Sequence, residues 1–157
     1  MDVLTAAQRS FNMSRIRGRD TAPELLIRRA LHARGFRYRL HGRKLPGKPD
    51  LVFPKFRAVI FVHGCFWHGH DCHLFRWPAT RREFWEEKII RNQERDSCAV
   101  RALRESGWRV LNIWECALKG TTRLAVADIA GRCVEFLRSP SIQEGAIEGA
   151  PARERAR

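Results

Sequence analysis

The strongest constraint on the fold is the alternation of apolar, strand-like runs with helical segments. "AVIFV", residues 58–62, is apolar at every position, which is typical of a buried central strand. "WRVLNIW", residues 108–114, predicts another strand, and a helical pattern over residues 80–107 separates the two. Strands separated in this way join one sheet through a helical crossover. The chain therefore predicts an α/β sandwich with a central sheet.

The remaining elements are marked by capping and turn residues. Thr21 and Glu24 form a T-x-x-E capping box, and Gly35 predicts the end of that helix. Thr80 and Glu83 form a second capping box, which predicts the start of another helix. Alternating apolar residues predict a strand after it, and a Pro and Gly turn precedes the next apolar run. The predicted order is a helix, three strands, a helix, a strand and a last helix, over residues 21–34, 36–40, 51–53, 58–62, 80–107, 108–114 and 121–137.

These elements define one domain with a segment on each side. Residues 1–19 are polar and basic, lack apolar periodicity and are interpreted as an arm used for contact with a partner rather than for packing. Residues 20–138 form the predicted folded domain. Residues 139–157 carry three Glu and three Arg, so the whole net charge of +13 belongs to residues 1–138, and we expect this last segment to be disordered.

The net charge of +13, from 30 Lys and Arg against 17 Asp and Glu, favours a polyanionic partner. Nucleic acid is the leading candidate, and a merely basic surface or an anionic membrane surface are the alternatives. No apolar run approaches the roughly 18 residues that span a bilayer, and the first residues lack a signal-peptide pattern. We therefore expect a cytosolic protein whose five cysteines are reduced. Cys98 and Cys133 lie within helical patterns and are expected to be core residues.

The stretch "FVHGCFWHGHDCHLF", residues 61–75, is dense in metal-ligand side chains. Cys65, His70 and Cys72 lie close together, and Cys116 follows the last predicted strand. Four ligands of this kind form a closed tetrahedral site, so they predict a structural Zn²⁺. The alternative is that they are small buried residues and solvated histidines.

A second constellation points to phosphodiester chemistry. Asp50 directly precedes the run "LVF", and His63 ends the next strand, which is the layout of nucleases with a PD-(D/E)xK motif. Here Phe61, Val62 and His63 replace the second half of that motif, so we expect Mg²⁺ on Asp50 and the Val62 backbone carbonyl. Asp50 as a simple turn residue is the alternative. Histidines then serve proton transfer, and Glu24 is either a helix cap alone or also an acid near the metal.

Five motifs together resemble the very-short-patch-repair (Vsr) mismatch endonucleases over residues 9–119. They are "RSFNMSRIRGRDTAPE", "LPGKPDLVF", "VIFVHGCFWHGHDC", "FWEEKIIRNQERD" and "GWRVLNIWECAL". The resemblance implies a restriction-endonuclease-like fold with a mixed central sheet. It also implies nicking of double-stranded DNA 5′ of the thymine in a T:G mismatch, the product of 5-methylcytosine deamination.

The resemblance implies a role for individual residues. It implies Mg²⁺ on Asp50 and the carbonyl of Val62, where other members carry Thr. His68 matches the proton-transfer histidine, His63 a second histidine near the scissile phosphate, and Glu24 the acid near the metal. The structural Zn²⁺ falls on Cys65, His70, Cys72 and Cys116, and His73 keeps no assigned role.

The resemblance also implies how DNA is held. Phe66, Trp67 and Trp85 match aromatics that wedge into the base stack, which is easier at a poorly stacked T:G pair than at a matched step. Met13 matches a residue that enters the minor groove, and Lys88 and Asn92 match groups near the mispaired bases.

A monomer is expected, with a mismatch-repair ATPase of the MutL type as a partner. The rival hypotheses are a non-catalytic, zinc-stabilised DNA-binding module and a restriction-type nuclease of other specificity.

Overall fold

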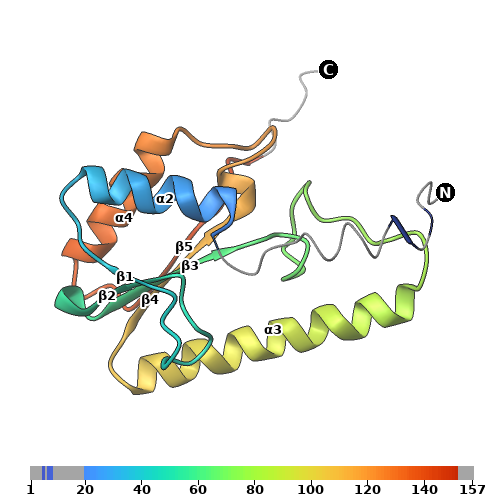
Figure 1. Ribbon diagram of the computed structural model, residues 1–157, viewed down its shortest axis with the longest axis horizontal. Helices are drawn as coiled ribbons and strands as arrows, with labels where there is room; N and C mark the ends of the chain where they lie inside the picture. Colours follow the sequence, from blue (N-terminus) through green and yellow to red (C-terminus); the bar gives the residue numbers. More distant parts are fainter. Residues whose placement is uncertain (1–4, 6, 9–19, 152–157) are drawn as a thin grey trace.

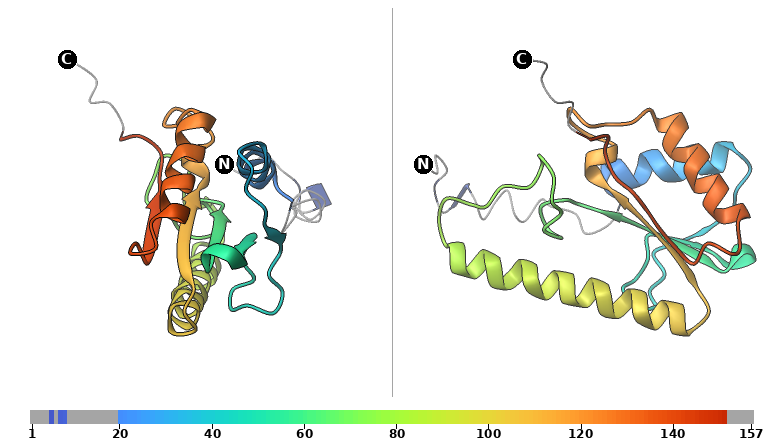
Figure 2. Two further views of the ribbon diagram at one scale, coloured as in Figure 1. Left: turned by 90° about the vertical axis from the view of Figure 1, so that its left-hand side faces the viewer. Right: turned by 180° about the vertical axis from the view of Figure 1, so that it is seen from behind.

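A five-stranded mixed sheet lies between two layers of helices in the computed structural model, which describes Thr5, residues 7–8 and residues 20–151. Helices α2 (Ala22–Ala33) and α4 (Val126–Arg138) cover one face, and α3 (Arg82–Glu105) covers the other (Figures 1 and 2). The strands and short 3-10 helices are β1 (Arg39–Leu40), β2 (Leu51–Phe53), η1 (Pro54–Phe56), β3 (Ala58–His63), β4 (Arg109–Trp114), η2 (Glu115–Ala117) and β5 (Glu144–Ile147). Most of the predicted arm, including Met13, lies outside the described residues.

The sheet order is β1-β2-β3-β4-β5, and the predicted mixed sheet is confirmed. β1, β2 and β3 pair antiparallel, whereas β3, β4 and β5 pair parallel. Parallel neighbours need a crossover connection. α3 provides it between β3 and β4, as predicted, and α4 provides it between β4 and β5.

Helices on both faces explain why β3 is apolar throughout. Ala58 and Ile60 pack into the core beneath α2 and α4, while Val59 and Phe61 pack on the opposite side with Leu103 of α3. A strand buried on both faces cannot alternate apolar with polar residues. Within the described part of the chain, no helix is long and apolar enough to cross a membrane.

Three predicted details of the helices and cysteines are wrong. The capping box at Thr80 does not form, because α3 begins at Arg82 and its N-cap residue, Arg81, has a left-handed backbone with φ 56°. α4 begins at Val126 rather than near residue 121. Cys98 is exposed on α3, whereas Cys133 is buried in the core as expected.

The prediction of a disordered segment from residue 139 is wrong for residues 139–151. This part of the chain adds β5 to the sheet, with Ile113 opposite Ile147, and Ile147 is 3% exposed. Its local composition offers few apolar residues, and its order comes from backbone pairing with β4, which lies far away in sequence. β5 thus carries the chain across the sheet to the edge where the candidate site lies.

Arg109→Met is expected to lower the free energy of unfolding by about 3 kcal/mol, because it leaves buried carbonyl groups without a donor. The Arg109 guanidinium is buried and donates to the carbonyl oxygens of Phe136 at 2.8 Å, Leu137 at 3.0 Å and Phe56 at 3.1 Å. It thereby ties β4 to the end of α4. Urea denaturation measures the change, and the exposed Arg132 on α4 provides a control as Arg132→Met. An equal effect of both substitutions would contradict the assignment.

Candidate active site and metal centre

The sheet topology brings the predicted catalytic residues to one edge. Asp50 precedes β2, and because β2 runs antiparallel to β3, it lies beside the end of β3. The backbone N–H of Val62 donates to Oδ2 of Asp50 at 2.7 Å. β4 runs parallel to β3 and ends at the same edge, with Trp114 opposite His63. Residues from three strands therefore meet here.

The carboxyl groups of Asp50 and Glu24 lie near each other at this edge. Burial raises the pKa of Asp50 to about 6, the Val62 N–H opposes that rise, and the charge of nearby Glu24 adds to it. Glu24 is 1% exposed, and among the described residues neither of its carboxylate oxygens has a hydrogen-bond partner. Buried carboxylates without donors are costly, and a divalent cation is a ligand that would satisfy them.

Only one of the two hydrogen bonds of the Thr21–Glu24 capping box is present. The backbone N–H of Glu24 donates to Oγ1 of Thr21 at 3.4 Å, as the capping box requires. The Glu24 side chain does not return the bond, because its oxygens have no such partner in the described chain. Nδ1 of His41 lies 3.5 Å from Oε1 of Glu24. The backbone N–H of His41 donates to the backbone carbonyl of Asp50 at 3.0 Å. His41 was not predicted as part of the site.

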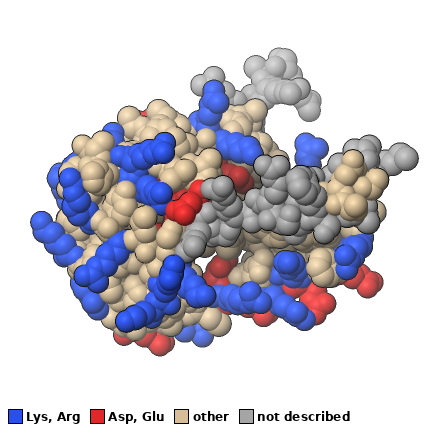
Figure 3. Space-filling model, viewed as in Figure 1, with Lys and Arg blue, Asp and Glu red and all other residues tan. Residues whose placement is uncertain are grey.

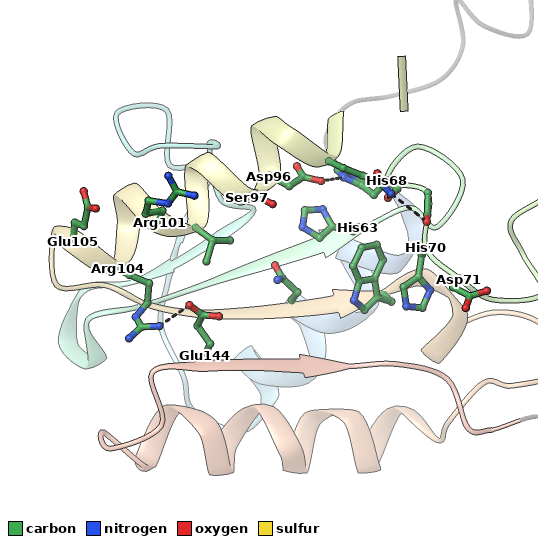
Figure 4. A pocket seen from close by; sticks show the side chains of 15 residues that line it. His63, His68, His70, Asp71, Asp96, Ser97, Arg101, Arg104, Glu105 and Glu144 are labelled. Atoms are coloured by element: carbon green, nitrogen blue, oxygen red, sulfur yellow. Dashed lines mark hydrogen bonds and ion pairs between the residues drawn. The ribbon is translucent and has the colours of Figure 1, made fainter. Parts of the chain in front are cut away.

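The two predicted histidines lie side by side. The ring centroids of His63 and His68 are 4.0 Å apart, and His63 also stacks on Phe61 at 5.3 Å. Burial, together with the neighbouring charge of His68, lowers the pKa of His63 to about 4, so His63 is neutral at physiological pH. Asp96 of α3 points at His68 and is hydrogen-bonded to Nδ1 of that ring (Figure 4).

Asp96 is a site residue that the sequence analysis missed. A signal was present, since Lys88, Asn92 and Asp96 recur at four-residue spacing and therefore share one face of a helix. That face turns toward the loop after β3. Asn92 Nδ2 donates to the carbonyl of Trp67 at 2.8 Å, and Gln93 Nε2 donates to the carbonyl of His68 at 3.2 Å. The helix thus fixes the loop that carries His68, the predicted proton-transfer histidine.

The predicted wedge residues form one half-buried aromatic cluster. The ring centroids of Phe66 and Trp67 are 5.2 Å apart, those of Phe66 and Trp85 5.3 Å, and those of Trp67 and Trp85 6.0 Å. Lys88 Nζ lies 5.7 Å from the centroid of Trp67. None of the three aromatics belongs to the buried core among the described residues. Their rings are therefore available for contact with a partner instead of being buried in the core.

A cleft of about 1000 Å³ connects the aromatic cluster with the sheet edge. A second hollow of about 780 Å³ lies behind His63 and His68, against α3 and β4, and Figure 4 shows its lining. Lys and Arg side chains spread over the body of the molecule and along its lower edge in Figure 3, so the surface suits a polyanion. The lining of the first cleft includes Asp20, Thr21, Pro23, Val62, His63, Phe66, Trp67, His68, Lys88 and Lys119.

The four predicted zinc ligands come together. One ligand atom from each of Cys65, His70, Cys72 and Cys116 lies within 4.8 Å of the others. The backbone N–H of Cys116 donates to Sγ of Cys65 at 3.3 Å. Cys116 lies in η2, just beyond the end of β4. His73 stands outside the cluster, with Nδ1 3.4 Å from Oγ1 of Thr122.

Gly69 allows the loop between these ligands to turn. Its φ is +61°, and a Cβ at this position would lie 2.6 Å from Nε2 of Gln93 and 2.6 Å from Cγ2 of Ile89. Both the left-handed backbone and the close approach to α3 require glycine. The loop can therefore present His68 to the cleft and His70 to the cysteines.

Comparison with known proteins identifies the family. A sequence profile described as DNA mismatch endonuclease Vsr matches residues 1–74. The DNA mismatch endonuclease Vsr of Escherichia coli (strain K12) is 48% identical over 136 residues, which cover 87% of each chain. The chain belongs to the Vsr family.

Other Vsr relatives carry nicking-enzyme names. The Type II nicking enzyme V.XorIIP of Xanthomonas oryzae pv. oryzae is 46% identical over 117 residues, covering 74% of this chain and 86% of the relative. The Type II nicking enzyme V.NmeAIP of Neisseria meningitidis is 44% identical over 118 residues, covering 75% of this chain and 84% of the relative. The family resemblance is thus confirmed, and the findings support a Vsr-type nuclease over a non-catalytic DNA-binding module.

Proposed function

We propose that this Vsr-family chain is a DNA mismatch endonuclease that nicks duplex DNA 5′ of the thymine in a T:G mismatch and so initiates very short patch repair. The observation that carries the proposal is one cleft, lined both by the catalytic edge at Val62, His63 and His68 and by the aromatics Phe66 and Trp67. A reacting phosphate and a deformed base step can therefore be held together. The name of the Escherichia coli relative supports mismatch specificity.

Asp50 and the backbone carbonyl of Val62 would hold Mg²⁺, with Glu24 close by. The fit rests on the buried Glu24 oxygens, which have no hydrogen-bond partner in the described chain, and on the raised pKa of Asp50. When bound, the ion supplies Lewis-acid stabilisation of the charge that develops on the phosphate. The Val62 N–H holds Oδ2 of Asp50, and Asp50 lines a smaller pocket of about 170 Å³ together with Val62, His63 and His68.

His68 carries the proton in this proposal, and Asp96 sets its orientation. Because Asp96 occupies Nδ1 of His68, Nε2 is the nitrogen left for proton transfer. The Asp96 carboxylate lies directly beside the positive charge that would form when His68 accepts a proton. His63 is neutral, so it contributes a hydrogen bond near the scissile phosphate rather than a charge.

Phe66, Trp67 and Trp85 are proposed to enter the base stack beside the mismatch. Their cluster is half-buried, and Lys88 above Trp67 adds a positive charge near the backbone or the mispaired bases. Unstacking a step costs a few kcal/mol, and this cost is smaller at a poorly stacked T:G pair. Asn92 is bonded to the Trp67 carbonyl, so its proposed contact with the bases would be made from a residue that also anchors the wedge.

We propose that Zn²⁺ cross-links the loop that carries both the wedge residues and His68 to η2. Two thiols from the loop, one from η2 and the imidazole of His70 match a structural Cys₃His site. Burial raises the pKa of the Cys65 thiol, so a cation is needed to hold this sulfur as a thiolate. The site would fix the distance between wedge and catalytic edge.

With Mg²⁺, a duplex carrying one T:G pair is expected to be nicked roughly 100-fold faster than its T:A counterpart, as a few kcal/mol of unstacking cost predicts. Labelled strands on a denaturing gel give both the rate and the position of the nick. The assay contains this protein alone, because we propose that a monomer suffices and that a MutL-type ATPase only assists. Equal cleavage of both duplexes at one sequence would instead support a restriction-type nuclease.

A further inference from the structure

The C-terminal segment after β5 contacts the proposed zinc ligands. Oε1 of Glu148 lies 3.0 Å from Nε2 of His70. Nδ1 of the same ring faces the cysteines, 3.7 Å from Sγ of Cys116. A carboxylate that accepts from Nε2 fixes the tautomer in which Nδ1 has a free lone pair for a metal. Glu148 therefore orients His70 toward the cluster.

A second contact comes from the next residue. The backbone N–H of Gly149 donates to Sγ of Cys116 at 3.3 Å. Hydrogen bonds to a thiolate stabilise its charge. A Cβ on Gly149 would lie 2.5 Å from the Cys116 carbonyl oxygen and 2.4 Å from Oγ1 of Thr122, so no side chain fits there. The Ala150 N–H then donates to the Thr122 carbonyl at 2.8 Å.

The sheet places these contacts. Ile147 of β5 pairs with Ile113 of β4, so the next residues of the two strands leave the sheet at the same edge. Beyond that edge, β4 continues into η2 with Cys116, and β5 continues into Glu148 and Gly149. Two independent hydrogen bonds to two different ligands thus follow from one register.

We propose that residues 148–150 are the outer shell of the zinc centre, with Glu148 as a positioning residue that acts through His70. This inference rests on the proposed Zn²⁺ site. Metal binding and docking of the C-terminal segment stabilise each other, because His70 and Cys116 belong to both. Since His68 lies two residues before His70, the segment also helps to hold the catalytic loop in place.

Glu148→Ala is expected to speed the release of Zn²⁺ to a chromogenic chelator by about 10-fold, the lower end of the range for outer-shell partners, since Glu148 is partly exposed. Glu148→Gln keeps an acceptor oxygen and should fall between Glu148→Ala and the wild type. Glu144→Ala is the matched control, because it removes the same charge from the same segment. Glu144 pairs with Arg104 at the far end of the hollow from His70 (Figure 4).

Hydrogen exchange of the full chain gives a second measurement that does not depend on nicking. Chelation of Zn²⁺ should speed exchange at the amides of Gly149 and Ala150 more than at Val110, which lies in the core of the sheet. This inference would be overturned if Glu148→Ala released Zn²⁺ at the wild-type rate, or if chelation did not change exchange at Gly149 and Ala150. Either result would leave the zinc site intact. Purified wild-type protein without Zn²⁺ would sink the zinc site itself.

Discussion

Asp50→Asn is expected to slow nicking at least about 10³-fold and, without divalent metal, to make the protein more stable at pH 7.5. The rate falls because Asn lacks the charge that is proposed to hold Mg²⁺, and a metal centre supplies several kcal/mol of charge stabilisation. Stability rises because burial and Glu24 raise the pKa of Asp50 from 3.8 to about 6. The carboxyl then binds its proton more tightly in the folded chain than in the unfolded chain.

The sign of this linkage gives a pH signature. Protonation of Asp50 stabilises the fold fully below its unfolded pKa, and that stabilisation is lost as pH rises from about 4 through about 6. At pH 7.5 the charged Asp50 therefore costs roughly 3 kcal/mol in metal-free protein, which Asn removes. At pH 4 the two proteins should be nearly equal in stability.

Urea denaturation in chelator at pH 4, 6 and 7.5 measures the difference between the two proteins. Glu135→Gln, an exposed acid on α4, is the control and should change neither stability nor nicking beyond small effects. A stability difference that does not depend on pH would contradict the proposed environment of Asp50. Nicking by Asp50→Asn at the wild-type rate would contradict its catalytic role.

The site residues that local sequence patterns predicted lie together in the structure. Cys65, His70 and Cys72 lie within one short loop, and Cys116 follows a strand that must end at the same sheet edge as β3. Asp50 and Val62 meet because an antiparallel pair places the start of one strand beside the end of the next. Such inferences need only strand order and direction, which apolar runs and helical segments provide.

Residues whose position depends on long-range packing were missed. Asp96 reaches His68 only because α3 crosses the sheet with one face toward the loop, and no local pattern fixes that rotation. Glu148 was assigned to a disordered segment, because the pairing of β5 with β4 cannot be seen in a stretch of balanced charge. The expected box at Thr80 fails for a related reason, since the turn at Arg81 delays the helix. Tertiary context decides the positions of Asp96 and Glu148.

Asp96→Asn should lower the nicking rate at saturating T:G substrate by about 10³-fold and leave DNA affinity within a few-fold of wild type. Asn can still accept a hydrogen bond from Nδ1 of His68, but it lacks the charge that stabilises the protonated ring, and it can also hold the wrong tautomer. Asp96 lies on the α3 side of His68 and is not among the residues that line the aromatic cleft. Its substitution should therefore spare binding.

Single-turnover nicking and equilibrium binding, each with the same T:G duplex, separate these two effects. Glu94→Gln is the matched control, because Glu94 is exposed on the same helix and its loss changes the net charge equally. A parallel loss of binding and rate would mean that Asp96 only supports the loop fixed by Asn92 and Gln93. Loss of rate alone, with Zn²⁺ content unchanged, is the result that a proton-transfer pair requires, since the loop itself is then intact.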